Sequence, residues 1–171
     1  MRKIIIDINN IEAIIFDFDG VLTDNSVLLN YNGEEFVKCN RSDGLGFDAL
    51  KKINKPTYII STEKNKAVTA RGDKLNIPVI QGIEDKCSAL EELCIKNNFS
   101  LDKLVYVGND LNDFKVMKLC GFSVCPSDSH KDIKIIADYV LKTSGGNGVV
   151  RELIEDLMGL DLVKILYDTK I

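Results

Sequence analysis

Short apolar runs alternate with amphipathic segments along most of the chain. Apolar runs bounded by turn residues predict buried strands at about 12–18, 57–61, 78–81, 104–108, 122–125 and 138–141. Apolar residues at helical spacing predict helices at about 44–53, 64–75, 85–97, 113–119, 132–137 and 149–157. Strands that alternate with helices in this order favour an α/β fold, in which helices cover both faces of a mainly parallel sheet.

A β-hairpin insertion is predicted at about 26–40, directly after the first strand. Two extended runs flank Asn32-Gly33, a dipeptide in which both residues tolerate positive φ. The hairpin should project from the sheet, and its unpaired outer edge favours assembly with other subunits. The alternative is a solvent-exposed hairpin without a partner. After it, Ser42-Asp43 is expected to cap the helix at 44–53.

The composition is that of one globular domain over residues 1–171. Of the 171 residues, 45% are hydrophobic and 28% are charged, and no linker or repeat divides the chain. The net charge of −4 gives no indication of a nucleic-acid or membrane partner, and no apolar run has transmembrane length. Five cysteines without CxxC spacing are expected to be reduced core thiols, which favours a cytoplasmic protein.

Two carboxylates follow the first predicted strand. Alternation along an extended chain puts Asp17 and Asp19 on one side and Phe18 on the other. Two like charges this close are costly unless a cation lies between them, so a hard divalent ion such as Mg²⁺ is expected. Taken alone, the same string also fits an Asx-rich turn that closes a strand.

Further polar residues follow other strands of the predicted sheet. Ser61 and Thr62 end the second strand, the segment 109–113 ends the fourth, and Lys86 begins a helix on the same side. In open α/β sheets, ligands bind beyond the carboxyl ends of the strands. These positions therefore predict one polar site.

The same residues carry a resemblance to a known family. FDFDGVLTD, Ser61, Lys86 and GNDLND resemble the four motifs of the haloacid dehalogenase superfamily of phosphotransferases, over nearly the whole chain. The resemblance implies a Rossmann-like three-layer fold. The small size, with a hairpin where relatives carry a cap domain, resembles the capless branch that hydrolyses phosphorylated ulosonic acids. RSDGLGFDAL, QGIEDK and GGNGVVREL resemble further markers of that branch, whose members are usually homotetramers joined through the hairpins.

The resemblance implies a role for each motif residue. Asp17 would be the nucleophile, since a carboxylate with an ordinary pKa is ionised at neutral pH and needs no base. Asp19 would protonate the leaving sugar oxygen and later take a proton from the attacking water. Ser61 and Lys86 would hold the phosphoryl oxygens. Thr23, just beyond the loop, would steady Asp19.

The implied Mg²⁺ ligands are Asp17, the backbone carbonyl of Asp19, and the residue after Gly108. That residue is commonly Asp in the superfamily and is Asn109 here. An amide oxygen can coordinate Mg²⁺ but contributes no charge. Asp110 or Asp113 would compensate through the waters of the metal. A weakly active or non-catalytic oligomerisation module, of the kind associated with some CMP-sialate synthetases, is the alternative.

The substrate prediction depends on the helix after Ser61. Glu63 stands where octulosonate-type relatives generally have Arg, and together with Arg71 and Lys74 it resembles the nonulosonate type. Arg71 and Lys74 share a helix face suited to a substrate carboxylate, and Glu63 suits sugar hydroxyls. The alternative is an ordinary solvated helix face. Thr62 is also expected to contact substrate. The resemblance implies that the tail with Arg151 reaches toward the active site of a neighbouring subunit and contacts substrate there; the alternative is a flexible C-terminal connector.

We therefore expect a Mg²⁺-dependent phosphatase that acts on a nonulosonate 9-phosphate of sialic-acid type, such as the phosphate of KDN or Neu5Ac. The alternative substrate is 3-deoxy-D-manno-octulosonate 8-phosphate. A phosphomutase would use the same aspartates but must exclude water, and the expected lack of a cap domain argues against it.

Overall fold

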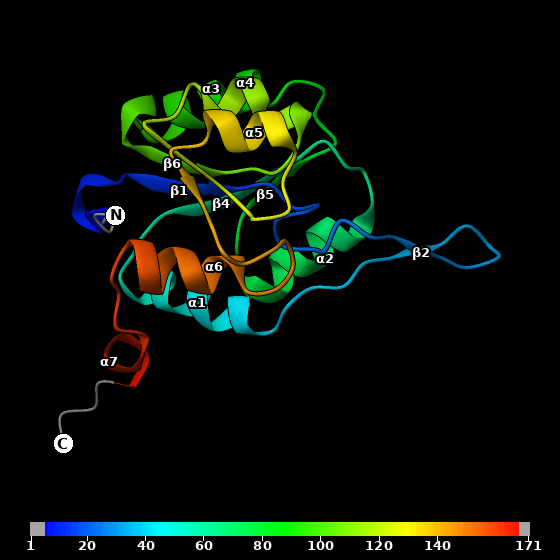
Figure 1. Ribbon diagram of the computed structural model, residues 1–171, viewed down its shortest axis with the longest axis horizontal. Helices are drawn as coiled ribbons and strands as arrows, with labels where there is room; N and C mark the ends of the chain where they lie inside the picture. The colour runs from blue at the N-terminus through cyan, green and yellow to red at the C-terminus, as the bar shows by residue number, and fades with distance from the viewer. Residues whose placement is uncertain (1–5, 168–171) are drawn as a thin grey trace.

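A six-stranded parallel sheet lies between two layers of helices in the computed structural model, which describes residues 6–167 (Figure 1). The strands are β1 (Ala13–Phe16), β4 (Thr57–Ser61), β5 (Val79–Gln81), β6 (Leu104–Val107), β7 (Phe122–Cys125) and β8 (Tyr139–Val140). Their order in the sheet is β5-β4-β1-β6-β7-β8. The chain therefore leaves β1 toward one edge and later returns to build the other. This topological switch point is where open α/β sheets bind ligands.

The helices divide between the two faces of the sheet. On one face lie α1 (Ser42–Lys52), α2 (Lys66–Leu75) and α6 (Val149–Glu152), and on the other lie α3 (Lys86–Asn97), α4 (Phe114–Met117) and α5 (Lys131–Ile136) (Figure 1). Helix α6 continues into a π-helical turn, Leu153–Leu157, and α7 (Leu162–Tyr167) packs against α1. Short 3₁₀ turns occupy Ile8–Asn10, Leu101–Lys103 and Leu111–Asp113. Residues 6–167 include no cap domain.

Strand β1 supplies both hydrophobic cores. Ile14 and Phe16 face the α1 and α6 side, whereas Ala13 and Ile15 face the α3 side, and all four side chains are fully buried. A strand covered on both faces is apolar at every position. This explains why the first motif begins with an uninterrupted hydrophobic run.

The strands and the order of the main helices confirm the predicted α/β fold, and the hairpin is present but short. Its strands β2 (Leu28–Leu29) and β3 (Glu35–Phe36) pair over only two residues each. Figure 1 shows the hairpin extending away from the sheet beyond α2. Leu28, Leu29, Tyr31 and Phe36 are more than half exposed, which leaves a hydrophobic surface on a weakly paired ribbon.

The turn of the hairpin differs from the predicted two-residue turn. Leu29 pairs with Glu35, so five residues form the loop. The side-chain oxygen of Asn30 accepts hydrogen bonds from the backbone N–H groups of Asn32 (2.9 Å) and Glu34 (3.0 Å). Only Gly33 of the expected pair has positive φ, at 79°. Local side-chain bonding by Asn30 sets this turn, and sequence alone did not reveal it.

The start of helix α1 differs from the prediction because a side chain outside the helix sets it. Helix α1 begins at Ser42, and Asp43 lies inside its first turn and is not its cap. The side chain of Asn40 accepts the backbone N–H of Ser42 at 2.9 Å and its hydroxyl at 2.7 Å. Helices α2 and α3 each end at an exposed asparagine in the left-handed conformation, Asn76 with φ 55° and Asn98 with φ 57°.

The five cysteines are free thiols, and Cys94 and Cys125 among them are buried. Within residues 6–167, no helix is both long enough and apolar enough to span a membrane.

Candidate active site

The carboxyl end of β1 presents Asp17 and Asp19 at the switch point. The N–H of Asp17 still donates to the carbonyl of Val107, and the chain then turns through Gly20, whose φ is 77°. Asp17 is only 3% exposed and Asp19 is half-buried, while Phe18 points into the core. The residues that line a cavity of about 420 Å³ at this point are Asp17, Asp19, Asn25, Val27, Ser61, Thr62, Glu63, Asn109, Asp110, Leu111 and Asn112.

A buried lysine joins Asp17, which lines this cavity, to a second carboxylate. The Nζ atom of Lys86 lies 2.9 Å from Oδ1 of Asp17 and 2.7 Å from Oδ1 of Asp113. All three side chains are at most 4% exposed. Lys86 is the first residue of α3, and Asp85 caps that helix by accepting the N–H of Cys87 at 2.9 Å. The cap fixes the point from which the lysine reaches the sheet.

Asp113 is held in place by groups other than Lys86. Its Oδ1 accepts the hydroxyl of Tyr106 at 2.9 Å, and its Oδ2 accepts the backbone N–H of Asn109 at 2.9 Å. Tyr106 is fully buried within β6. Sequence reasoning did not identify Tyr106; the available signal was a hydroxyl-bearing side chain inside an otherwise apolar strand.

Burial changes the ionisation of Asp17. The pKa of Asp17 is raised to about 8: burial is the largest cause, the nearby Asp113 carboxylate adds to it, and Lys86 opposes both effects. Burial alone would lower the pKa of Lys86, but the two carboxylates raise it. The ordinary pKa on which the sequence argument relied therefore does not apply to Asp17 in the free protein. A bound cation would favour its ionised form.

Thr23 connects Asp19 to the turn that follows it. Its buried hydroxyl donates to Oδ1 of Asp19 at 3.4 Å and accepts the N–H groups of Gly20 (3.1 Å) and Asn25 (3.3 Å). Burial raises the pKa of Asp19, with a further contribution from Glu63, and the hydrogen bond from Thr23 lowers it. A raised pKa favours the protonated form, which can donate to a leaving group.

Asn109 supplies an oxygen without a partner. Its side chain is 6% exposed, and Oδ1 has no hydrogen-bond partner among the described residues. A Cβ atom at Gly20 would lie 1.9 Å from Nδ2 of Asn109, so only glycine fits against this amide. Residues 6–167 hold no group of three His, Cys, Asp or Glu side chains placed to bind a metal. A carboxylate, an unpartnered amide oxygen and a backbone carbonyl nevertheless suit a hard cation.

The predicted substrate residues divide into two groups. Thr62 and Glu63 line the cavity, and the hydroxyl of Ser61 accepts the N–H of Glu63 at 3.1 Å. Arg71 and Lys74 do not line it: Nη2 of Arg71 donates to the carbonyl of Asn40 at 2.7 Å, and Lys74 is exposed on α2.

Arg151 also lies apart from the cavity of this chain. Its guanidinium forms two bonds of 2.8 Å with Glu155, one turn further along.

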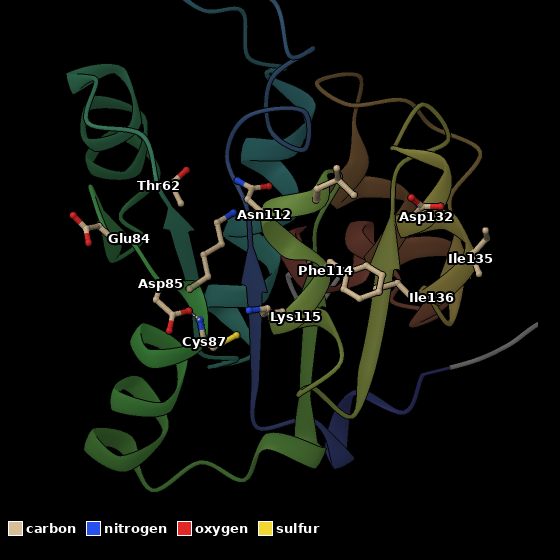
Figure 2. Close-up of a pocket in the computed structure, with 12 residues that line it drawn as sticks. Thr62, Glu84, Asp85, Cys87, Asn112, Phe114, Lys115, Asp132, Ile135 and Ile136 are labelled. Carbon is tan, nitrogen blue, oxygen red and sulfur yellow. Dashed lines mark hydrogen bonds between the residues drawn. The ribbon is translucent and has the colours of Figure 1, made fainter.

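A second cavity adjoins the first and was not predicted. It measures about 920 Å³ and lies between the start of α3 and the helices α4 and α5 (Figure 2). Thr62, Leu111 and Asn112 line both cavities. Phe114 and Ile136 form part of its apolar wall, beside the charged groups of Asp85 and Lys115.

The profile of the haloacid dehalogenase-like hydrolases matches residues 29–153, which is more than half of the chain. The chain belongs to this family.

The relatives of this hydrolase include named phosphatases. The 3-deoxy-D-manno-octulosonate 8-phosphate phosphatase KdsC of Salmonella typhi is 37% identical over 150 residues, which cover 87% of this chain and 80% of that protein. The structure of the corresponding phosphatase from Yersinia pestis matches with a TM-score of 0.84 and 33% identity, covering 88% of this chain and 82% of that one.

A third relative was solved with ligands. The 3-deoxy-D-manno-octulosonate 8-phosphate phosphatase of Moraxella catarrhalis, in complex with a magnesium ion, a phosphate ion and KDO, matches with a TM-score of 0.83 and 32% identity. The match covers 92% of this chain and 88% of that one. The chain is thus a homologue of these phosphatases.

The raised pKa of Asp17 predicts how the stability of the metal-free hydrolase depends on pH. Because the pKa of Asp17 is about 8 in the folded protein and 3.8 ordinarily, the folded state binds more protons between these values. Asp17 therefore contributes stability that is complete below the lower pKa and is lost as the pH rises through the higher pKa. Urea unfolding in a chelating buffer, between about pH 5 and pH 8, should therefore show falling stability, with a shallower fall in Asp17→Asn. If the free energy of unfolding fell equally with pH in the wild type and in Asp17→Asn, the raised pKa of Asp17 would be contradicted.

Proposed function

We propose that the protein is a Mg²⁺-dependent phosphatase that hydrolyses the phosphate monoester of an ulosonic acid through an aspartyl-phosphate intermediate. The observation that carries the proposal is the buried contact of Lys86 with Asp113 and with Asp17, which lines a cavity at the switch point. Like charges are not buried together without a cation, and this arrangement leaves one carboxylate facing the cavity.

Asp17 is the nucleophile in this proposal. An oxygen of its carboxylate attacks phosphorus, a new phosphorus–oxygen bond forms, and the bond to the sugar oxygen breaks. Lys86 and the hydroxyl of Ser61 face the transferring group and stabilise its charge. Because Asp113 already fixes Lys86, the ammonium is in position before the reaction begins.

Asp19 moves the protons. It gives its proton to the departing sugar oxygen, and it then takes one from the water that attacks the aspartyl phosphate. The second step releases inorganic phosphate and restores the Asp17 carboxylate. The hydrogen bond from Thr23 orients Asp19 for both transfers.

Asp17, the backbone carbonyl of Asp19 and Asn109 would hold the Mg²⁺ ion. The unpartnered, buried Oδ1 of Asn109 supports this assignment. The ion supplies positive charge that offsets the repulsion between the Asp17 carboxylate and an anionic phosphate. Asp113 binds Lys86 and backbone N–H groups, so its effect on the metal is indirect.

The eight-carbon substrate, 3-deoxy-D-manno-octulosonate 8-phosphate, is favoured over the nonulosonate 9-phosphate expected from the sequence. Relatives that cover most of this chain at 32–37% identity are named for the eight-carbon ester. The positions that favoured the nine-carbon ester give weaker support, because Arg71 and Lys74 do not line the cavity of this chain.

The nine-carbon ester remains the second candidate on one observation. Glu63 lines the cavity, and its carboxylate can accept hydrogen bonds from sugar hydroxyls. Its Oε1 already accepts the N–H groups of Lys64 (2.6 Å) and Asn65 (2.9 Å), which holds the carboxylate near the start of α2.

A side-by-side assay of phosphate release with Mg²⁺ tests the proposed activity. We expect the eight-carbon ester to be hydrolysed with a higher kcat/KM than the nine-carbon ester, and Asp17→Asn to abolish release from both because it lacks the nucleophile. The reverse preference would favour the nonulosonate 9-phosphate as the substrate and would leave the mechanism intact. No release from either ester by the folded wild-type protein would favour the non-catalytic oligomerisation module.

Asn109→Asp tests the metal assignment. The added charge should lower the Mg²⁺ concentration for half-maximal activity by about tenfold, which corresponds to about 1.4 kcal/mol of binding free energy. Asn112→Asp is the matched control, because Asn112 lines the same cavity but is exposed. Equal shifts in the two variants would indicate a general charge effect and reject Asn109 as a ligand.

We propose further that the hairpin joins subunits into a homotetramer. Leu28 is 71% exposed, Leu29 is 61% exposed and Tyr31 is 97% exposed. Apolar side chains on a ribbon with free edges are typical of strands that pair with another chain.

Sedimentation velocity tests the assembly. The wild type should sediment at four times the 19.1 kDa mass of one chain, and a Leu28→Ser, Leu29→Ser variant should sediment at a lower mass. Ile95→Ser on α3, where the side chain is 82% exposed, controls for loss of surface hydrophobicity and should remain a tetramer. A monomeric wild type would refute the assignment.

A further inference from the structure

The structure brings together two segments to which the proposed reaction assigns no role, the RSDGLGFDAL segment and the GGNGVVREL segment. Asp43, in the first turn of α1, accepts the backbone N–H of Val150, in the first turn of α6, at 3.0 Å. The first N–H groups of a helix have no partner inside that helix. Asp43 therefore caps α6 from a neighbouring helix.

A buried carboxylate is a costly cap, and the stability of α6 alone does not explain it. Asp43 is 1% exposed, and its Oδ2 atom has no hydrogen-bond partner among the described residues. Burial raises the pKa of Asp43 to about 6, and the N–H groups of Val150 and Arg151 act in the opposite direction. A buried carboxylate that is only half satisfied costs folding free energy. Such a group is expected where it holds a functional element in place.

The element that Asp43 holds is the glycine loop, residues 145–148, which precedes α6. The N–H of Gly146 donates to the carbonyl of Val21 at 3.0 Å. A Cβ atom at Gly145 would lie 2.2 Å from the carbonyl oxygen of Gly20. A Cβ atom at Gly146 would lie 2.5 Å from the backbone nitrogen of Asp24. The glycine loop thus touches, backbone to backbone, the turn that carries Asp19.

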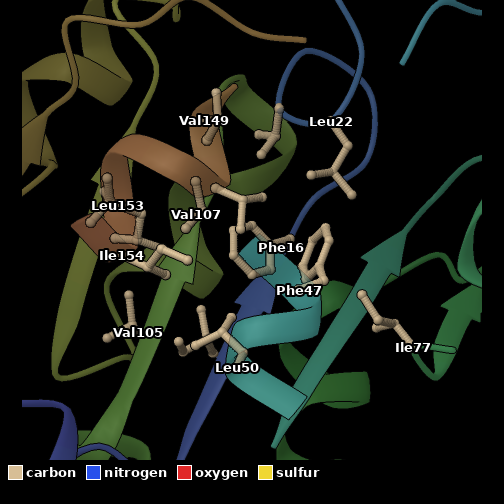
Figure 3. Packing of buried hydrophobic residues seen from close by; sticks show 14 of the residues in the cluster. Phe16, Leu22, Phe47, Leu50, Ile77, Val105, Val107, Val149, Leu153 and Ile154 are labelled. Carbon is tan, nitrogen blue, oxygen red and sulfur yellow. The ribbon is translucent and has the colours of Figure 1, made fainter. Parts of the chain in front are cut away.

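The glycine loop is fastened at its other end as well. Asp128 accepts the N–H of Gly145 at 2.9 Å, and Glu152 of α6 accepts the N–H groups of Lys142 (2.9 Å) and Thr143 (2.8 Å). Figure 3 shows Val149 of α6 and Leu22 of the Asp19 turn within one packed cluster. A shift of the start of α6 would therefore move the glycine loop against the Asp19 turn.

We propose that Asp43 is a positioning residue for Asp19. By capping α6, Asp43 fixes the glycine loop, and the glycine loop in turn fixes the turn from which Asp19 reaches the leaving group. The inference rests on the proposed function in that it takes Asp19 as the proton donor.

The chemistry of the leaving group provides a specific readout. A sugar alkoxide is a poor leaving group that must receive the proton of Asp19, whereas para-nitrophenolate leaves without protonation. A displaced Asp19 should therefore lower kcat/KM, which reports formation of the aspartyl phosphate, much more for the sugar ester than for para-nitrophenyl phosphate. The later attack of water on the aspartyl phosphate also uses Asp19, but this step is common to both esters and does not enter kcat/KM. A general loss of folded protein would slow both equally.

The test compares Asp43→Ala, Asp43→Asn and the control Asp48→Asn, an exposed carboxylate on the same helix. Asp43→Ala should lower kcat/KM for the sugar-acid phosphate by about tenfold and kcat/KM for para-nitrophenyl phosphate by less than about threefold, a fraction of what a general acid contributes. Asp43→Asn keeps an acceptor oxygen and should fall between Asp43→Ala and the wild type. Asp48→Asn should match the wild type. Equal losses on both esters, or no loss, would overturn the proposal.

A measurement without substrate separates this proposal from the proposed function. Amide hydrogen exchange over residues 145–150 should be faster in Asp43→Ala than in Asp48→Asn, and unchanged exchange would overturn the positioning role. If the wild type hydrolyses neither ester, the proposed function fails, and this exchange result alone decides the role of Asp43. If Asp43→Ala does not fold, Gly145→Ala, which displaces the glycine loop while leaving the Asp43 cap in place, should give the same split between the two esters, and equal losses would refute the proposal.

Discussion

The buried position of Lys86 between two carboxylates is the constraint on which the rest of the structure depends. Each of the three charges would be costly to bury alone, and together they are satisfied only if their distances are short. Asp17 comes from β1, Asp113 follows β6, and Lys86 begins α3. Three segments far apart in the chain must therefore meet within hydrogen-bond distance. The parallel sheet achieves this because β1 pairs with β6, and α3 packs over the face that both strands share.

The charges of this cluster also determine what it can bind. Two carboxylates and one ammonium leave an excess of one negative charge when all are ionised, and one of the carboxylates, Asp17, lines the cavity. A phosphate alone would be repelled. A divalent cation held by these residues would reverse the local sign and make the same cavity attractive to an anionic ester.

The sequence allowed the sheet, most helices and the residues around the cavity to be predicted, because these depend on periodicity and on where strands end. Asp17, Ser61 and Asn109 follow apolar runs directly, so their meeting was a consequence of the parallel sheet. Tyr106 was not assigned a role, and Asp43 was expected to cap its own helix and not α6, because their partners come from segments that only tertiary packing brings near. The cavity contacts expected for Arg71 failed for the same reason, since a backbone carbonyl of another segment takes its guanidinium.

The asparagines that end α2 and α3 have a consequence for the durability of the protein. Both helices begin near the carboxyl ends of the strands, where the cavity lies, so Asn76 and Asn98 lie near the amino ends of the strands. Each holds a backbone conformation that glycine adopts with less strain. The backbone at Asn76 and Asn98 is thus more strained than it needs to be, at two positions far from the cavity. Glycine at either position would raise the free energy of unfolding, and the gain would offset destabilising substitutions near the cavity.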